Sequence, residues 1–150
     1  MRIRSTLLRL AYPLLKRYWR MRAPYQRVVR VVVRHEGEIL LVRHAYGAAA
    51  WGVPGGGIKR GEDPLEAGVR ETREETGIRL FRIEGVPDNP LQSVHGNGEL
   101  WVFLADAVSR EHRVDGVEIL DSRWSPEEHF PTELLDQARQ ALDAAGIRTA

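Results

Sequence analysis

The sequence predicts an α/β protein in which a mixed β-sheet lies between helices (α/β/α), with an extra amphipathic helix at the N-terminus. Several runs of β-branched and aromatic residues indicate strands, and apolar residues at helical spacing indicate the helices. The chain has 150 residues, of which 43% are hydrophobic and 29% charged. This is enough for one globular domain with its own core.

Charge is distributed unevenly along the chain. Residues 1–34 contain ten Lys or Arg and no acid, so the remaining 116 residues carry a net charge of −9. We therefore expect a basic arm, residues 1–24, attached to an acidic domain, residues 25–150. The absence of cysteine excludes disulfide and thiolate chemistry and is compatible with a cytoplasmic location. No stretch approaches the ~20 apolar residues of a membrane span.

The basic arm contains an amphipathic pattern over residues 5–22, with leucines and a tyrosine at helical spacing and arginines on other faces. Three interpretations stay open. The apolar stripe docks on the domain or on a second copy of the chain, giving a homodimer. Alternatively, the helix lies on an anionic membrane surface as a peripheral contact, or it is an organelle transit peptide. Charges interrupt every apolar run, which excludes a secretory signal.

The domain begins with a predicted β-hairpin. Residues 27–34 and 39–42 are rich in Val, Ile and Leu, and EGE at 36–38 forms the turn between them. A small-residue loop at 47–50 follows the hairpin. The run WGVPGGG then leads to glycines at 55–57, which allow the backbone to approach a metal ion or a phosphate closely.

A helix is predicted from about Pro64 to Thr76. Asp63 is a favourable N-cap, Pro64 suits the first helical position, and Glu66 completes a capping-box pattern. Gly77 is the expected residue after the last turn.

The second half of the chain contains three more strands and a helix. The expected order of elements is therefore β-β-α-β-β-β-α. The predicted strands are 79–84, 99–107 and 117–124, with a turn at 85–92, a polar loop at 108–116 and a C-terminal helix at 131–145.

Three acids on the helix predicted from about Pro64 to Thr76 form the strongest chemical signal. Glu71, Glu74 and Glu75 stand at i, i+3 and i+4, so their carboxylates share one helical surface. Such a cluster needs compensating cations, and oxygen ligands of this kind suit Mg²⁺ or Mn²⁺. Arg70 can reach back to Glu66 or Glu62, which predicts a tie between the helix and the preceding loop.

These residues resemble the Nudix box, G-x5-E-x7-R-E-U-x-E-E-x-G-U, where U is a bulky apolar residue. One position departs: Thr72 stands where an aliphatic residue is usual, which is expected to weaken helix packing without touching a ligand. The pattern covers 23 residues, and its flanks extend the resemblance over about 27–130. The matching residues are Gly56, Glu62, Arg70, Glu71, Glu74, Glu75, Gly77 and Ile78.

The resemblance implies a Nudix fold and a divalent-metal-dependent hydrolase. Its expected substrate is a nucleoside diphosphate linked to another moiety, or a related nucleotide, and water attacks one phosphoanhydride bond at phosphorus. Glu71 and Glu75 are the first choices for metal ligands, with Glu74 and the Gly56 carbonyl in support. Arg70 is expected to position these groups.

The general base and the substrate contacts are less narrowly defined. A box glutamate or a later acid could serve as base, and Glu118 and Asp121 are the later candidates. The candidate substrate contacts are His44, His95, Tyr46 and Trp51, of which Tyr46 and Trp51 are candidates for stacking on a base.

One alternative function stays open, a Nudix-fold nucleotide-binding or regulatory module that is catalytically silent. The intact set of three glutamates argues against it. No nucleic-acid partner is expected, because the domain is acidic and the bases of the arm are not interleaved with exposed aromatics. Markers of the Nudix subfamilies are absent downstream of the box, so the sequence does not specify the nucleotide.

Overall fold

The computed structural model describes residues 25–45, 47, 49–114 and 116–149. The expectations for the arm at 1–24 and for Tyr46 therefore lie outside the described residues. Neither of the two described helices has the length and apolarity needed to cross a bilayer.

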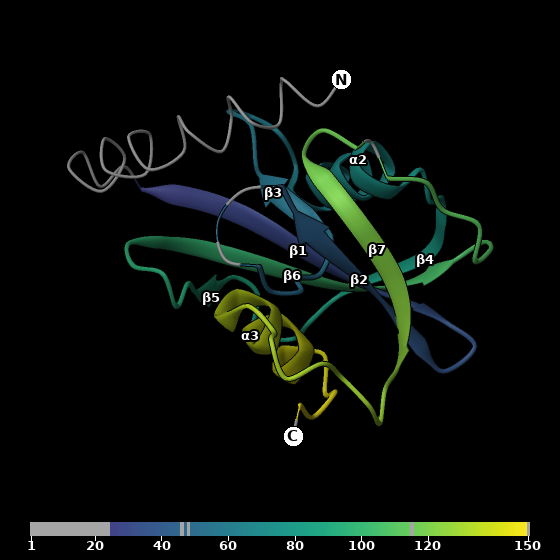
Figure 1. Cartoon of the computed structure of the whole chain (residues 1–150). Coiled ribbons are helices and arrows are strands. Elements are labelled where there is room, and N and C mark those ends of the chain that lie inside the picture. The colour runs from purple at the N-terminus through teal and green to yellow at the C-terminus, as the bar shows by residue number, and fades with distance from the viewer. Residues whose placement is uncertain (1–24, 46, 48, 115, 150) are drawn as a thin grey trace.

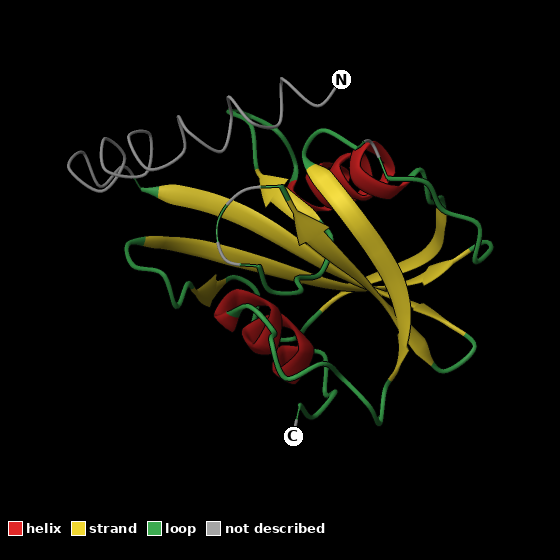
Figure 2. Ribbon diagram, viewed as in Figure 1, coloured by secondary structure: helices red, strands yellow, loops and turns green. Residues whose placement is uncertain are grey.

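Strands and helices form three layers, with a twisted sheet between α2 and α3 (Figure 1, Figure 2). The sheet order is β4-β6-β1-β2-β7, with β3 paired to β1 and β5 paired to β6. Among the described strands, β1 and β6 pair in parallel and the other ladders are antiparallel. The elements are β1 Gln26–His35, β2 Glu38–His44, β3 Gly55–Gly57, α2 Pro64–Thr76, β4 Leu80–Gly85, β5 Leu91–Gln92, β6 Gly98–Ala107, β7 Ile119–Pro126 and α3 Asp136–Ala144.

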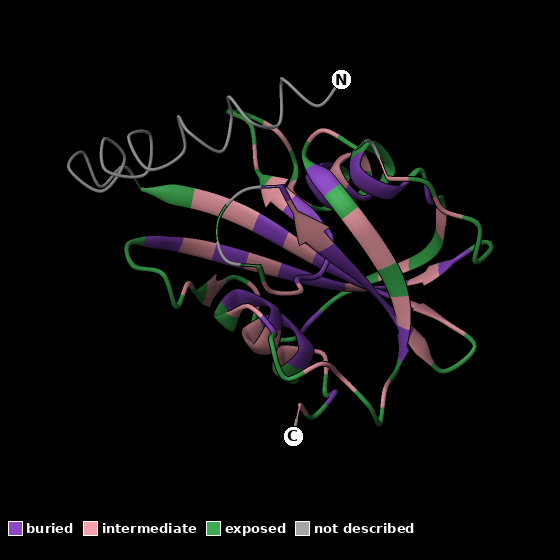
Figure 3. Ribbon diagram, in the orientation of Figure 1, coloured by how far each residue is buried: buried purple, intermediate pink, exposed green. Residues whose placement is uncertain are grey.

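Alternation along β1 divides the core into two halves, because successive side chains of a strand point to opposite faces. Val29, Val31 and Val33 pack on the α2 side, together with Leu40 and Ala67. On the other face, Val28 and Val32 belong to the cluster that includes Leu134, Ala138 and Leu142 beside α3. Figure 3 shows the buried positions concentrated along the central strands and on the helix surfaces that face them.

The termini of α2 confirm the predicted helix. The Asp63 carboxylate accepts hydrogen bonds from the N–H groups of Leu65 (2.9 Å) and Glu66 (3.3 Å). Gly77 has a left-handed φ of 70°, and its N–H donates to the Arg73 carbonyl. Thr72, the departure from the family pattern, is fully buried, and its hydroxyl has no hydrogen-bond partner among the described residues.

The C-terminal helix was predicted to begin at residue 131, and this predicted start is wrong, because α3 begins at Asp136. Residues before Asp136 pair instead with Trp51: the Trp51 N–H donates to the Glu133 carbonyl (2.7 Å) and the Leu135 N–H donates to the Trp51 carbonyl (2.9 Å). These bonds hold the segment extended, so the helix can begin only at Asp136. The short strands β3 and β5 were not predicted, because three glycines and a Leu-Gln pair carry no strand pattern.

Candidate active site

A glycine strand brings the loop before α2 against β1. Gly55 pairs with Arg30 and has a φ of +146°, which favours glycine. A Cβ atom on Gly55 would stand 2.1 Å from the Val29 carbonyl oxygen. Only glycine therefore allows β3 to approach β1 at this position.

Glu75 lies behind this strand as a buried carboxyl group. Its residue surface is 4% exposed, and its Oε2 accepts a hydrogen bond of 3.0 Å from the Gly55 N–H. Burial raises the pKa of Glu75 to about 8, despite that hydrogen bond and the opposing effect of the nearby Arg30 charge. A buried carboxylate of this kind favours a cation beside it.

Glu71 lies one turn earlier on α2, against the next glycine. A Cβ atom on Gly56 would stand 2.6 Å from the Glu71 Cδ and 2.7 Å from both carboxylate oxygens. The absence of a side chain at Gly56 therefore forms the space that the Glu71 carboxylate occupies.

Arg70 connects α2 to the loop that precedes it. Its Nε lies 2.7 Å from Glu62 Oε1, its Nη1 lies 2.7 Å from Glu71 Oε1, and its Nη2 donates to the Gly57 carbonyl. The tie to Glu62 confirms one of the two predicted partners, whereas Glu66 forms no ion pair with Arg70 or with any other described residue. The hydrogen bond from Arg70 lowers the pKa of Glu62 to about 2. The same hydrogen bond is the largest cause of the raised pKa of Arg70.

Glu74 has the most open position of the three acids. Its side chain is 59% exposed, compared with 14% for Glu71, and its Oε2 lies 3.3 Å from Arg70 Nη1. An exposed ion pair of this kind contributes little to stability.

The residue types of the predicted donor set suit a divalent cation. Glu71 and Glu75 supply carboxylate oxygens, Gly56 supplies a backbone carbonyl, and its missing side chain leaves the Glu71 carboxylate room beside it. Within the described ranges, no three His, Asp or Glu side chains already converge as a metal cluster. Arg70 instead supplies the positive charge next to Glu71 and Glu74.

The two candidate bases outside the helix have different surroundings. Glu118 is exposed just before β7, its carbonyl accepts the Ala45 N–H (2.8 Å), and its charge contributes to the raised pKa of Glu75. It therefore lies within electrostatic range of the acidic site. Asp121 is ion-paired with Arg43 over 3.2 Å. Of the two acids, Glu118 is the one whose charge acts on Glu75.

The candidate substrate contacts in the described residues come from three separate segments of the chain. Trp51 is half-buried against the core cluster beside α3. His44 ends β2, and its Nε2 lies 4.0 Å from the position of a Cβ on Gly52. His95 is exposed in the loop before β6, where its N–H donates to the Ser93 hydroxyl.

Three arginines near the site were missed by the sequence analysis. The Arg30 Nε donates to the buried Gln137 of α3 over 2.9 Å. Arg43 and Arg123 both lie over the Trp51 ring. Strand alternation could have placed these side chains on one face, but only if the pairing of the strands had been known.

The fold and this site define a Nudix-type domain, and comparison with known proteins agrees. The family model described as NUDIX domain matches residues 24–145. A solved MutT NUDIX hydrolase from Burkholderia pseudomallei superimposes with a TM-score of 0.69 at 28% identity, covering 79% of this chain and 96% of the other. This chain belongs to the Nudix hydrolase family.

Two curated relatives are similar over part of the chain. An RNA pyrophosphohydrolase of Bartonella quintana is 44% identical over an alignment of 69 residues, with 40% of this chain and 40% of that protein covered. The NAD-capped RNA hydrolase NudC of Photorhabdus laumondii is 31% identical over 117 residues, covering 77% of this chain and 44% of that protein. The chain thus spans less than half the length of these relatives.

Proposed function

We propose that this protein hydrolyses a phosphoanhydride bond in a nucleoside diphosphate linked to another moiety, or in a related nucleotide. The observation that carries the proposal is the buried Glu75 carboxyl beside Glu71 on one face of α2, behind a glycine strand. A diphosphate is strongly anionic, so an acidic site can accept it only if cations reverse the local field.

In this proposal, Glu71, Glu75 and the Gly56 carbonyl hold Mg²⁺ or Mn²⁺, with Glu74 in support. The ion would offset charge that develops on the phosphoryl group and lower the pKa of a bound water molecule. The chain's own contribution is orientation: the Gly55 N–H fixes Glu75, the Gly56 backbone seats Glu71, and Arg70 ties the helix to its loop.

Glu118 is the proposed general base outside the helix. It is exposed, and its charge acts on Glu75. A carboxylate at this position can accept the proton that the attacking water loses. Replacing Glu118 with Gln should therefore lower kcat more than KM.

Support for a nucleotide substrate comes from the family and from the names of the similar proteins, which are pyrophosphohydrolases or cap hydrolases of RNA. A substrate screen is the experiment that identifies the nucleotide. We would incubate the full chain with nucleotide sugars, dinucleotides, nucleoside triphosphates, damaged deoxynucleotides and triphosphorylated RNA, with Mg²⁺ or Mn²⁺, and measure the released products.

Glu71→Gln is the test variant, and Glu66→Gln, exposed on the same helix, is the matched control. Changes outside the direct ligands of metal sites cost roughly 10- to 100-fold, so loss of a ligand should cost at least that much. Turnover that is unaffected by Glu71→Gln would contradict the proposed site. Ligand binding without turnover on any of these compounds would favour the catalytically silent module instead.

A further inference from the structure

Two arginines lie over one indole ring, that of Trp51, in the segment that leads to the glycine strand. The Arg43 guanidinium of β2 lies 5.3 Å from the centroid of the Trp51 ring, and that of Arg123 in β7 lies 4.6 Å from it. The face of an indole ring attracts cations. Both guanidinium groups are therefore held in place before any ligand arrives, which lowers the entropy cost of binding one.

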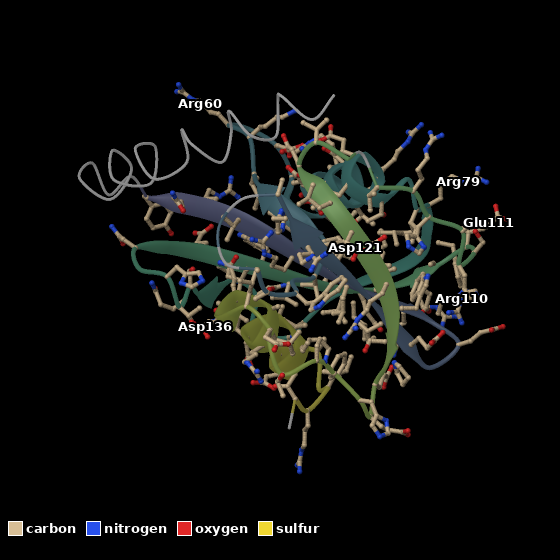
Figure 4. All side chains as sticks on the ribbon, in the orientation of Figure 1. Arg60, Arg79, Arg110, Glu111, Asp121 and Asp136 are labelled. Atoms are coloured by element: carbon tan, nitrogen blue, oxygen red, sulfur yellow. The ribbon has the colours of Figure 1, made fainter. Side chains whose placement is uncertain are left out.

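These two arginines lie on the α3 side of the sheet. The strand register pairs Arg123 with Leu41, and Leu41 belongs to the core cluster beside α3. It also pairs Arg43 with Asp121, which Figure 4 shows on β7 near the centre of the view. We call Arg43, Trp51 and Arg123 the arginine–tryptophan patch.

The patch carries excess positive charge. Asp121 lies 3.2 Å from Arg43 and offsets one of the two charges. Arg123 is exposed, and no acidic side chain in the described part of the chain lies within ion-pair distance of it. An exposed, oriented guanidinium with no acid beside it suits a phosphate group, which it can bind through two parallel hydrogen bonds.

The patch is also close to the candidate active site along the chain. Trp51 precedes Gly55 by four residues, a span of at most about 14 Å. Two residues after Arg43, the Ala45 N–H donates to the Glu118 carbonyl and joins the end of β2 to the segment before β7. Because the patch lies on the α3 side of the sheet and α2 lies on the other side, a ligand with its diphosphate at Glu71 and Glu75 would reach the patch past the joined ends of β2 and β7.

We propose that the arginine–tryptophan patch binds a phosphate group of the substrate beyond the diphosphate that is hydrolysed. This inference rests on the proposed function, which identifies the substrate as a nucleotide. The experiment that tests it measures binding and does not require hydrolysis. The same chemistry has two sources, a phosphodiester near the 5′ end of an RNA chain or an additional phosphate on a free nucleotide. It would also revise the expectation that no nucleic acid binds.

Three probes that are not hydrolysed separate these sources. A 3′-labelled pentaribonucleotide with a 5′-monophosphate offers phosphodiesters, ATP with methylene bridges offers additional phosphates, and AMP offers neither. We would measure the Kd of each for the full chain with Mg²⁺ over a series of salt concentrations. The variants are Arg43→Gln, Arg123→Gln and Arg123→Lys.

Arg110→Gln is the matched control, because Arg110 also lies over a tryptophan, Trp124, at 5.9 Å. Trp124 packs with the core cluster on the α2 side, and Figure 4 shows Arg110 well apart from Asp121. The control thus removes a similar cation–ring contact at another place. Thermal unfolding of each variant verifies that it is folded.

The glutamine variants in the patch should weaken binding of at least one extended probe several-fold and leave AMP unchanged. For RNA, the slope of log affinity against log salt should fall by about 0.7 for each arginine removed. Arg123→Lys should restore most of the slope. If the variants weaken binding of the RNA probe alone, the patch binds a phosphodiester of RNA. If they weaken binding of the methylene-bridged ATP alone, the patch binds an additional phosphate of a free nucleotide.

Equal affinities of wild type and patch variants for both extended probes would overturn the inference. An equal loss for AMP, or an equal loss in Arg110→Gln, would also overturn it, since either would show a general effect on the fold. Because none of these probes is hydrolysed, an inactive protein in the substrate screen would refute the proposed function without affecting this test.

Discussion

The N–H of Gly55 donates a hydrogen bond of 3.0 Å to the carboxyl group of Glu75, across 20 residues of sequence. This contact joins the glycine strand to the buried face of α2. It orients a buried acid that stands one helical turn after Glu71.

The burial of Glu75 predicts a pH-dependent stability. Its pKa rises from 4.5 to about 8, mainly through burial, so between these values the folded protein holds a proton that the unfolded chain releases. The contribution to stability is full below pH 4.5 and is lost as the pH rises to about 8. In EDTA, the free energy of unfolding should fall across this window, and Glu75→Gln should remove most of that fall.

Denaturant unfolding at several pH values would measure this effect. Glu84→Gln, exposed in β4, is the control and should keep the wild-type profile. A wild-type stability that stays level from pH 4.5 to 8 would show that Glu75 is ionised in the fold. Because a metal ligand must be deprotonated, Mn²⁺ affinity should also rise over the same window.

Gly56→Ala should damage the site without unfolding the protein. The added Cβ would stand 2.6 Å from the Glu71 Cδ, so the carboxylate must move. A displacement of about 1 Å in a catalytic group can cost about 100-fold in rate. Steady-state kinetics would measure it, with Gly57→Ala as the control, since a Cβ there meets nothing within 4 Å. Equal rates in the two variants would refute the role of Gly56.

Two buried threonines in α2 predict opposite effects on stability. The Thr72 hydroxyl has no hydrogen-bond partner, so Thr72→Val should stabilise the protein by about 1 kcal/mol. The Thr76 hydroxyl donates to the Thr72 carbonyl over 2.6 Å, so Thr76→Val should destabilise it by about 1 kcal/mol. Chemical denaturation would compare the two. Destabilisation by both would mean that the Thr72 hydroxyl has a partner, such as a bound water molecule.

Arg70→Gln should loosen the loop before α2. The change removes the ion pair with Glu62 and the hydrogen bond to the Gly57 carbonyl, so amide exchange over residues 57–63 should accelerate. Arg73→Gln, exposed on the same helix, is the control and should leave the exchange unchanged. Unchanged exchange in Arg70→Gln would show that the loop is held by other contacts.

Local sequence signals were sufficient to predict the framework of the fold. The Asp63 cap, Gly77 and the β-branched runs act over short distances, so α2 and the long strands were predicted to within about two residues. The acidic face of α2 could also be predicted from the sequence, because helical spacing alone brings Glu71, Glu74 and Glu75 together.

Contacts between segments that are distant in the sequence could not be predicted from local sequence signals. The start of α3 is set by pairing with Trp51, and the burial of Glu75 is set by β3. The arginine–tryptophan patch depends on the register between β2 and β7. Each needs the tertiary arrangement, which single-segment propensities do not contain.

The most direct test of the central claim is the initial rate of hydrolysis as a function of Mg²⁺ concentration. It should be measured for wild type and Glu75→Gln, with the best substrate from the screen. We predict saturable dependence on Mg²⁺ in the wild type, no turnover in EDTA, and a loss of at least about 100-fold in the variant. Turnover that persists in EDTA, or that Glu75→Gln leaves intact, would contradict a metal-dependent hydrolase built on this acid.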